Sequence, residues 1–178
     1  VAYDSNGQVC MIGADGAGGT CLVDGASPVW APQGDRLLVE RAGAGGSVIW
    51  QVSVDGSTAK PLAAGESPSW SPDGARIAFS VRSAPSQHMS IFLMAPEGGS
   101  QTLFTTDGRL PAWSADGRLL AFITSGDVIV AVDTAGNVIT PVGSGLLFRW
   151  SPRGQDVALL DGGRLLVAKV GAAPRQIV

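Results

Sequence analysis

The sequence has little charge and no excess of basic residues. Charged side chains make up 15% of the 178 residues, and the formal net charge is −3 at pH 7. A surface that binds nucleic acid or an anionic membrane needs a basic excess, so the composition excludes both kinds of partner. No apolar run approaches the roughly 20 residues of a membrane-spanning helix, so we expect no membrane insertion of this segment. The hydrophobic share of 45% is typical of a packed core rather than of a disordered chain.

The residues that usually carry catalysis are also scarce. His88 is the single histidine, and no Gly-x-Ser-x-Gly sequence is present to provide a nucleophilic serine. The sequence has neither a Gly-Lys-Ser/Thr phosphate-binding loop nor an acidic calcium-binding loop. Two cysteines and one histidine are too few for a tetrahedral zinc site. We therefore predict a protein that is not an enzyme and that holds no metal and no cofactor.

What the sequence does contain is glycine, proline and a repeat. Gly and Pro number 25 and 11. Four tryptophans stand 40, 43 and 37 residues apart, each with a glycine four residues later: Trp30, Trp70, Trp113 and Trp150. An apolar triplet begins seven residues after each Trp, as in Ile77-Ala78-Phe79. Four units that align this well indicate a repeat architecture with a period near 40 residues.

Each repeat predicts a small sheet of four antiparallel strands. Ser71-Pro72-Asp73-Gly74 is typical of a type I turn, which joins a strand ending at Trp70 to one over 77–79. Third strands are predicted over 48–52, 90–94, 128–132 and 164–169, and short fourth strands over 59–62, 101–104, 138–142 and 175–178. No segment predicts a helix. Small sheets bury both faces when they stack radially around an axis, so we predict an all-β chain with the β-propeller architecture.

The repeated Trp-Ser-Pro-Asp-Gly sequence and its following apolar strand resemble the TolB-like propeller repeat, a relative of the WD-type repeat. The resemblance covers nearly the whole chain and departs from the pattern at Gln33, Ala115 and Arg153, which changes turn preference only. It implies a rigid scaffold. The fixed place of Trp in the repeat predicts packing between adjacent sheets, although stacking of an exposed ring on a sugar or peptide is the alternative. Trp50 lies outside the repeat position.

The repeat divides the chain, as a single domain over 1–178, into five blades. Their approximate units are 1–26, 27–66, 67–109, 110–146 and 147–178. Val1-Ala2-Tyr3 aligns with the apolar triplet, so the first blade begins at its second strand and lacks its innermost one. Either this is a five-bladed ring with one incomplete blade, or it is a fragment of a larger propeller. In both cases an unpaired strand edge allows self-association.

Cys10 and Cys21 are the only cysteines, and both belong to the first blade. A turn centred near position 15 or 16 sets them opposite each other on the third and fourth strands. Opposed Cβ atoms of an antiparallel pair lie about 4.5–5.5 Å apart, which favours a cross-strand disulfide and hence an oxidising compartment. The alternative is a pair of small buried thiols.

Candidate binding residues lie where the links between second and third strands vary in length. The longest such links are predicted over 40–47 and 80–89. Because variable loops on a rigid scaffold often bind ligands, we place a weak candidate site on this rim. It comprises Arg41, Arg82, His88, Asp107 and Arg109. Arg149, the one charge immediately before a repeat Trp, is a further candidate at the channel mouth. The plainer interpretation is a solvated surface histidine for His88 and a surface or rim arginine for Arg149.

The predicted function is that of a non-catalytic scaffold. We expect an extracytoplasmic propeller, periplasmic or extracellular, that binds a protein or peptide partner through one face. Two alternatives remain open. One is the gating propeller of a larger hydrolase that resembles prolyl oligopeptidases. The other is the ligand-sensing ectodomain of a membrane receptor or kinase.

Overall fold

The computed structural model describes residues 1–83, 88–134, 139–154 and 156–177. These residues form 19 strands in five separate sheets, and no helix is present among them. No helix in that part of the chain is therefore long and apolar enough to cross a membrane. The all-β architecture predicted from the repeat is confirmed.

The five sheets, here called blades 1 to 5 in chain order, are simple antiparallel meanders. Blade 1 has three strands: β1 (Ala2–Ser5), β2 (Gln8–Met11) and β3 (Thr20–Asp24). Blade 2 has four: β4 (Ala26–Trp30), β5 (Arg36–Gly43), β6 (Gly46–Ser53) and β7 (Ala59–Ala64). Blade 3 consists of β8 (Glu66–Trp70), β9 (Ile77–Arg82), β10 (Met89–Met94) and β11 (Gln101–Thr105). Blade 4 consists of β12 (Arg109–Trp113), β13 (Leu119–Ile123), β14 (Val128–Asp133) and β15 (Ile139–Ser144). Blade 5 consists of β16 (Leu147–Trp150), β17 (Asp156–Asp161), β18 (Arg164–Lys169) and β19 (Arg175–Gln176).

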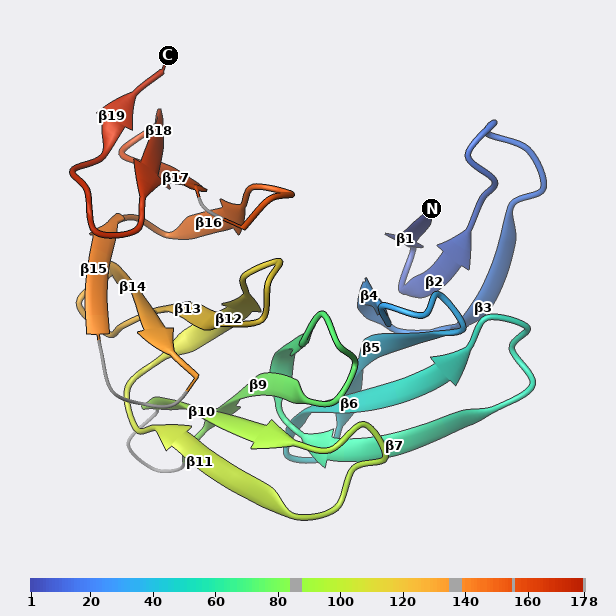
Figure 1. Ribbon diagram of the computed structural model, residues 1–178. Coiled ribbons are helices and arrows are strands. Elements are labelled where there is room, and N and C mark those ends of the chain that lie inside the picture. Colours follow the sequence, from blue (N-terminus) through green and yellow to red (C-terminus); the bar gives the residue numbers. More distant parts are fainter. Residues whose placement is uncertain (84–87, 135–138, 155, 178) are drawn as a thin grey trace.

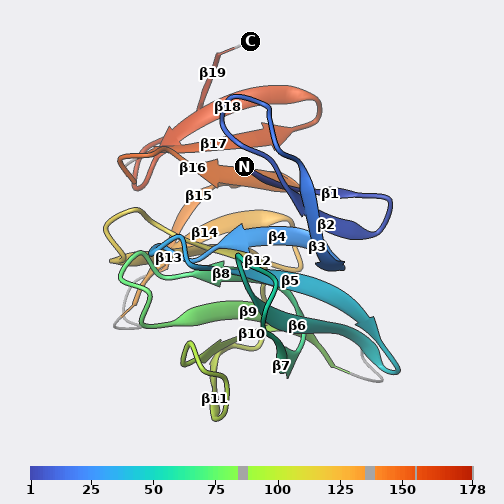
Figure 2. The ribbon, with the colours of Figure 1, turned by 90° about the vertical axis from the view of Figure 1, so that its right-hand side faces the viewer.

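The blades are arranged around an axis and form an open ring. In Figure 1, β4, β12 and β16 face the centre of the ring, whereas β3, β7, β11 and β15 lie on its outside. A gap separates blade 1 from blade 5, and no substantial contact joins these two blades within the described residues. Figure 2 views the ring from the side, with blades 3, 4 and 5 stacked one above another.

The core lies between successive blades, because each sheet buries one face against the next. Leu38 and Ile49 of blade 2 pack against Trp70 and Phe79 of blade 3, and all four side chains are buried. Equivalent clusters lie between blades 1 and 2, 3 and 4, and 4 and 5. Fully burying one large apolar side chain contributes about 1.5–3 kcal/mol, so these clusters are what hold the blades together.

The repeat tryptophans differ in environment more than the sequence predicts. Trp70 and Trp113 are only 7% and 9% exposed, which confirms packing between blades for these two. Trp150 is half-buried. The prediction is wrong for Trp30, which is 39% exposed, because the blade that precedes it has no innermost strand to cover the indole.

In blades 3 and 4 the turn that follows the repeat Trp is closed by its own side chains. Ser71 Oγ donates to Asp73 Oδ1, and the backbone N–H of Ala75 donates to the same oxygen at 3.0 Å. The Ser71 hydroxyl holds the pKa of Asp73 below its usual value. Ser114 does the same for the pKa of Asp116 in blade 4. These acids are therefore turn caps, as their positions in the sequence predict.

Blade 1 confirms two predictions. It begins at the strand equivalent to the second strand of the other blades, and its β1 pairs with β2 alone. Cys10 and Cys21 stand opposite each other on β2 and β3 and form a disulfide.

Both of the long links predicted from the sequence are shorter than expected. The 80–89 link begins only after Arg82, which ends β9 and pairs with Met89 of β10. Residues 40–47 are largely strand, because Ala42 pairs with Ser47 and Gly43 with Gly46, which extends the β5–β6 ladder almost to its turn.

Candidate functional site

One face of the ring carries the links between second and third strands together with the links between consecutive blades. We call it the rim face. The antiparallel meander places all of these links at the same end of the sheets. Arg41 lies on β5 near this face, Arg82 ends β9, and Arg109 begins β12. Residues 84–87, within the 80–89 link, lie outside the described residues.

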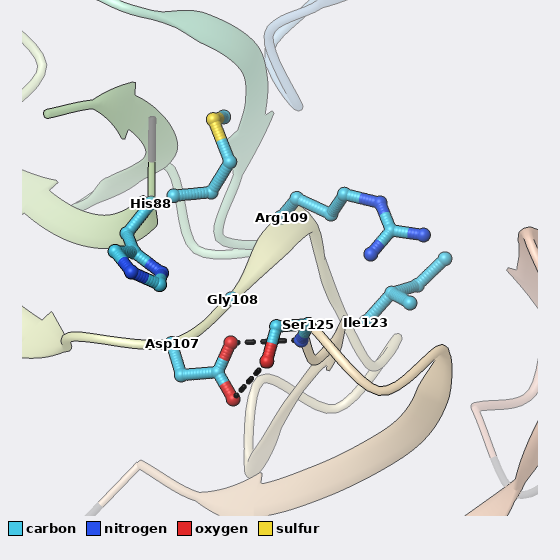
Figure 3. Close-up of a pocket in the computed structure, with 7 residues that line it drawn as sticks. His88, Asp107, Gly108, Arg109, Ile123 and Ser125 are labelled. Carbon is cyan, nitrogen blue, oxygen red and sulfur yellow. Dashed lines mark hydrogen bonds between the residues drawn. The ribbon is translucent and has the colours of Figure 1, made fainter. Parts of the chain in front are cut away.

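Three of the six predicted site residues line one hollow on the rim face. His88, Asp107 and Arg109 surround a space of about 180 Å³ between blades 3 and 4, together with Met89, Ile123 and Ser125. Figure 3 shows the His88 ring and the Asp107 carboxylate on the same side of this hollow, whereas the Arg109 guanidinium points away from Asp107. The structure therefore brings together a subset of the predicted residues.

Asp107 and Arg109 are both held by blade 4. Asp107 accepts the backbone N–H of Ser125 at 2.8 Å and the Ser125 hydroxyl at 3.3 Å (Figure 3). The guanidinium of Arg109 donates to the carbonyl of Thr124 at 2.9 Å and to Asp127 at 2.7 Å. These bonds tie the link between blades 3 and 4 to the 124–127 turn. Both side chains thus have a structural role, although Asp107, like His88, is exposed.

Arg41 and Arg82 do not line this hollow. The guanidinium carbon of Arg41 lies 4.4 Å from the centre of the Trp50 ring, in cation–π geometry. Arg82 forms a 3.3 Å ion pair with Glu66, at the link that leads into blade 3. Trp50, which stands outside the repeat position, therefore supports an arginine of its own blade.

A second and larger hollow lies on the axis of the ring. Its volume is about 330 Å³, and its walls come from the innermost strands of blades 2 to 5 and from β5. The lining is mostly small or polar: Ser27, Val29, Glu40, Ser67, Pro68, Ser69, Leu110, Pro111, Ala112 and Arg149. We call this space the central channel. Arg149, predicted for the channel mouth, does line it, and its guanidinium donates to the carbonyl of Phe148 at 2.9 Å.

Glu40 is the channel residue that the sequence alone does not reveal. One of its oxygens accepts the backbone N–H of Ser67 at 2.9 Å, across the boundary between blades 2 and 3. Burial raises the pKa of Glu40 above its ordinary value, the Ser67 hydrogen bond opposes that rise, and neighbouring Glu66 adds to it. Glu40 and Arg149 give the channel one acidic and one basic wall group, on blades 2 and 5.

The Glu40 bond belongs to a repeated arrangement. The residue three positions before Trp30, Trp70 or Trp113 has a positive φ, and its N–H donates to the preceding blade. The acceptors follow the apolar triplet: Asp4 for Ser27 at 3.3 Å, Glu40 for Ser67, and Ser80 for Leu110 at 3.2 Å. We call these bonds the blade latches. The signal in the sequence is a polar residue directly after the apolar triplet. Blades 4 and 5 lack it, because Ile123 and Leu160 occupy this position.

No metal site is formed by three or more His, Cys, Asp or Glu side chains within the ranges that the structure describes.

Solved structures with the same arrangement of blades are propellers. A putative TolB from Agrobacterium tumefaciens superposes with a TM-score of 0.73, at 21% identity over 90% of this chain and 65% of that one. This chain has the β-propeller fold. A chain of a nidogen/laminin complex matches with a TM-score of 0.73 at 9% identity, over 96% of this propeller and 70% of that chain. A prolyl endopeptidase matches all of this propeller over 36% of its own length, with a TM-score of 0.67 and 13% identity.

These similarities establish the fold. The propeller spans 56% and 65% of the two TolB structures that it matches. No protein-family model matches the sequence, and no curated protein matches it. The TolB-like resemblance seen in the repeat is thus confirmed by structures whose fold is the same.

Proposed function

We propose that this propeller is a non-catalytic module that binds an extended segment of a partner protein at the rim-face mouth of its central channel. The observation that carries the proposal is the channel lining, where one carboxylate and one guanidinium stand among serines, prolines and small apolar residues. A peptide offers charged side chains and backbone amides at short spacing, which such a lining can pair. The chain in the nidogen/laminin structure is a propeller found in a complex with another protein, which supports the same kind of role.

Each side chain has a part in this proposal. Arg149 pairs with a carboxylate of the segment, because a guanidinium recognises carboxylates through a planar fork of donors. Glu40 accepts an amide or a basic side chain with the oxygen that Ser67 leaves free. His88 lies in the neighbouring hollow of the rim face, where it contacts residues of the segment that extend beyond the channel. Arg41, Arg82 and Arg109 keep their structural partners.

We propose an extracytoplasmic location for the same module. The Cys10–Cys21 disulfide supports this, because disulfides persist in oxidising compartments and are rare in reducing ones. The protein or peptide partner is then one that meets the module outside the cytoplasm.

The channel is tested by selecting random linear peptides displayed on phage against the immobilised chain. Selected peptides are synthesised and measured on wild type and on the double variant Glu40→Gln with Arg149→Ala. We expect the double variant to bind about tenfold more weakly or worse, the effect of losing about 1.4 kcal/mol. The matched control is Arg118→Ala, which removes an exposed arginine from the opposite face and leaves affinity unchanged. The proposal is contradicted if the selected peptides bind the double variant as tightly as wild type, or if the selection enriches no peptide.

One observation favours a second candidate, the gating propeller of a larger hydrolase. All of this chain is covered by its match to the prolyl endopeptidase structure. In that case the central channel is a path for substrate rather than a binding site. A fluorophosphonate probe that labels a larger gene product containing this propeller supports the second candidate, and an unlabelled product supports the first.

A further inference from the structure

Blade 3 has an open outer edge in the middle of the chain. Its outermost strand β11 pairs with β10 and with no other strand among the described residues, and Figure 1 shows it on the outside of the ring. The residues of β11, Gln101–Thr105, include neither proline nor a charged side chain. Blades 2 and 4 are complete and flank blade 3, so this edge does not involve the gap in the ring.

The other outer strands have the residues that usually protect an open edge. Natural sheets keep exposed edges from pairing with prolines and charged side chains. Of the outer strands that the structure describes, four follow this rule. They contain Asp24 in β3, Lys60 and Pro61 in β7, Pro141 in β15 and Arg175 in β19. The edge of β11 has no such protection, so its backbone groups are available for a further strand.

Leu103 occupies the ladder position at which blades 2 and 4 have proline. Pro61 stands opposite Trp50 in blade 2, and Pro141 has the same place in blade 4. Leu103 stands opposite Phe92 in blade 3. All three ladders have a register shift directly beside this pair, which aligns the three positions. Because proline has no N–H, the ladder does not need a donor here, and the Leu103 N–H is free of it.

The hydrogen bonds of blade 2 show which way this backbone position faces. The N–H of Ser53 donates to the carbonyl of Thr58 at 3.0 Å, so the Thr58 backbone faces β6. Backbone groups alternate in direction along an antiparallel strand, so Lys60 also faces β6 and Pro61 faces the open edge. Leu103 has the register of Pro61, and its N–H and C=O therefore face outward from β11.

Contacts inside the ring hold β11 in place. Phe104 belongs to the cluster between blades 3 and 4, and its ring meets the Phe122 ring edge-on with centres 6.3 Å apart. Leu103, by contrast, is 49% exposed. A strand that is fixed by packing on one side and open on the other is preorganised, so a bound segment loses less free energy to ordering of the edge.

The rim-face end of β11 is followed by an acidic residue. Asp107 is exposed, and its carboxylate accepts the backbone N–H and the hydroxyl of Ser125. None of the ion pairs among the described residues includes Asp107, since Arg109 beside it pairs with Asp127. A segment that lies along β11 can therefore place a basic side chain against Asp107, which is the one charge complement that this edge offers.

We propose that the open edge of β11 binds an extended segment of a partner protein, which adds an outer strand to blade 3. The segment runs antiparallel to β11, places a β-branched or apolar residue beside Leu103, and carries a basic residue for Asp107 at its N-terminal end. A second copy of this chain is a poorer occupant. Two rigid rings that meet through one short strand bury far less than the roughly 1,200 Å² of a stable interface. This site does not depend on the channel site proposed above.

The probe is a synthetic heptapeptide that begins with lysine and continues with alternating threonine and valine, with a fluorescent label at its C-terminal end. We expect fluorescence polarisation to show saturable binding at protein concentrations below about 1 mM. Leu103→Pro gives blade 3 the residue that blades 2 and 4 already have, so the fold accommodates it. It removes the outward N–H and is expected to weaken binding at least about tenfold. The matched control Leu103→Thr keeps the N–H and is expected to bind within about threefold of wild type.

The acidic end of the edge has its own test. Asp107→Asn keeps an acceptor oxygen for Ser125 and removes the charge. We expect it to weaken binding of the lysine peptide about two- to fivefold, the effect of an exposed ion pair. A peptide with glutamine in place of the lysine is expected to bind Asp107→Asn and wild type equally. Glu40→Gln with Arg149→Ala is expected to bind the lysine peptide like wild type, which separates this site from the channel.

Backbone pairing is tested on the peptide, so that no protein variant needs to fold. Successive N–H groups of a strand point to opposite edges, so the even-numbered or the odd-numbered positions of the peptide face β11, but not both. One peptide is N-methylated at its central even position and a second at its central odd position. We expect one methyl group to weaken binding at least about tenfold and the other to have little effect.

Any of four results would overturn the proposal. The first is the absence of saturable binding of the probe peptide. The second is wild-type binding by a Leu103→Pro variant whose far-UV circular dichroism spectrum matches that of wild type. The third is equal weakening by the two N-methyl groups. The fourth is a dimer in sedimentation velocity that Leu103→Pro dissociates while the peptide does not bind, which would assign the edge to a second copy.

Discussion

At the scale of single residues, four tryptophans at one repeat position have different surroundings. Trp70 and Trp113 are buried between blades, and Trp30 is exposed because its neighbour strand is missing. We expect Trp70→Ala to lower the free energy of unfolding by about 3–5 kcal/mol, the cost of emptying a buried aromatic site. Trp30→Ala is expected to cost less than half as much, because less of its surface is removed from water. Urea unfolding followed by far-UV circular dichroism measures both.

Equal costs for the two variants would contradict this account of Trp30. A cost below about 1 kcal/mol for Trp70→Ala would contradict the packing role of Trp70 and would favour the alternative that its ring stacks on a ligand. The sequence could predict which residues repeat, because spacing is visible in it. It could not predict that equivalent residues differ in exposure, because exposure depends on whether a neighbouring strand exists.

At the scale of elements, the blade latches join one sheet to the next through a single side chain. Glu40 accepts the Ser67 N–H, and burial raises the pKa of this carboxyl above its ordinary value. Because the pKa of Glu40 is higher in the folded protein than in the unfolded chain, protonated Glu40 stabilises the fold. This stabilising contribution is complete below the unfolded pKa and is lost as the pH rises through the folded pKa. Glu40→Gln keeps the acceptor oxygen and removes the charge. We therefore expect it to match wild type near pH 4 and to equal or exceed its stability at pH 7.

Glu40→Ala is the companion variant, because it leaves the Ser67 N–H without its acceptor. We expect it to be about 1 kcal/mol less stable than Glu40→Gln at both pH values, as for a lost hydrogen bond. Urea unfolding of the three proteins at each pH makes the comparison. A Glu40→Gln variant that loses stability relative to wild type as the pH rises would show that the Glu40 charge is favourable in the folded protein.

The elements themselves were accessible from the sequence to a large extent. The Trp-turn-triplet unit predicted the first two strands of blades 2 to 5, and the offset of Val1-Ala2-Tyr3 predicted the three-stranded first blade. The extent of the β5–β6 hairpin was missed, because Gly43, Gly45 and Gly46 look like loop residues when ladder pairing is not known. The latch was missed because a polar residue after an apolar triplet has no visible partner until the blades are placed side by side.

At the scale of the whole molecule, blade 5 of the 1–178 chain exposes at the gap a face that blades 2 to 4 bury. Leu165 of blade 5 occupies the ladder position held by Ile49, Ile91 and Ile129 in blades 2 to 4. Those three isoleucines are fully buried against the next blade, whereas Leu165 and its cross-strand partner Leu160 are exposed at the gap. Exposed apolar patches of this kind mark association surfaces. We expect the chain to associate as its concentration rises.

Leu160→Lys combined with Leu165→Lys is expected to suppress that association, because two charges would have to lose their water at the contact. Folding stability is expected to stay within about 0.5 kcal/mol of wild type, since both side chains are exposed in the monomer. Leu103→Lys, an equally exposed leucine on the outer strand β11, is the matched control and should associate like wild type. Sedimentation velocity over a range of concentrations measures all three proteins. If the control suppresses association as strongly as the double variant does, the added positive charge is responsible, and the open end of the ring is not the surface through which the chains meet.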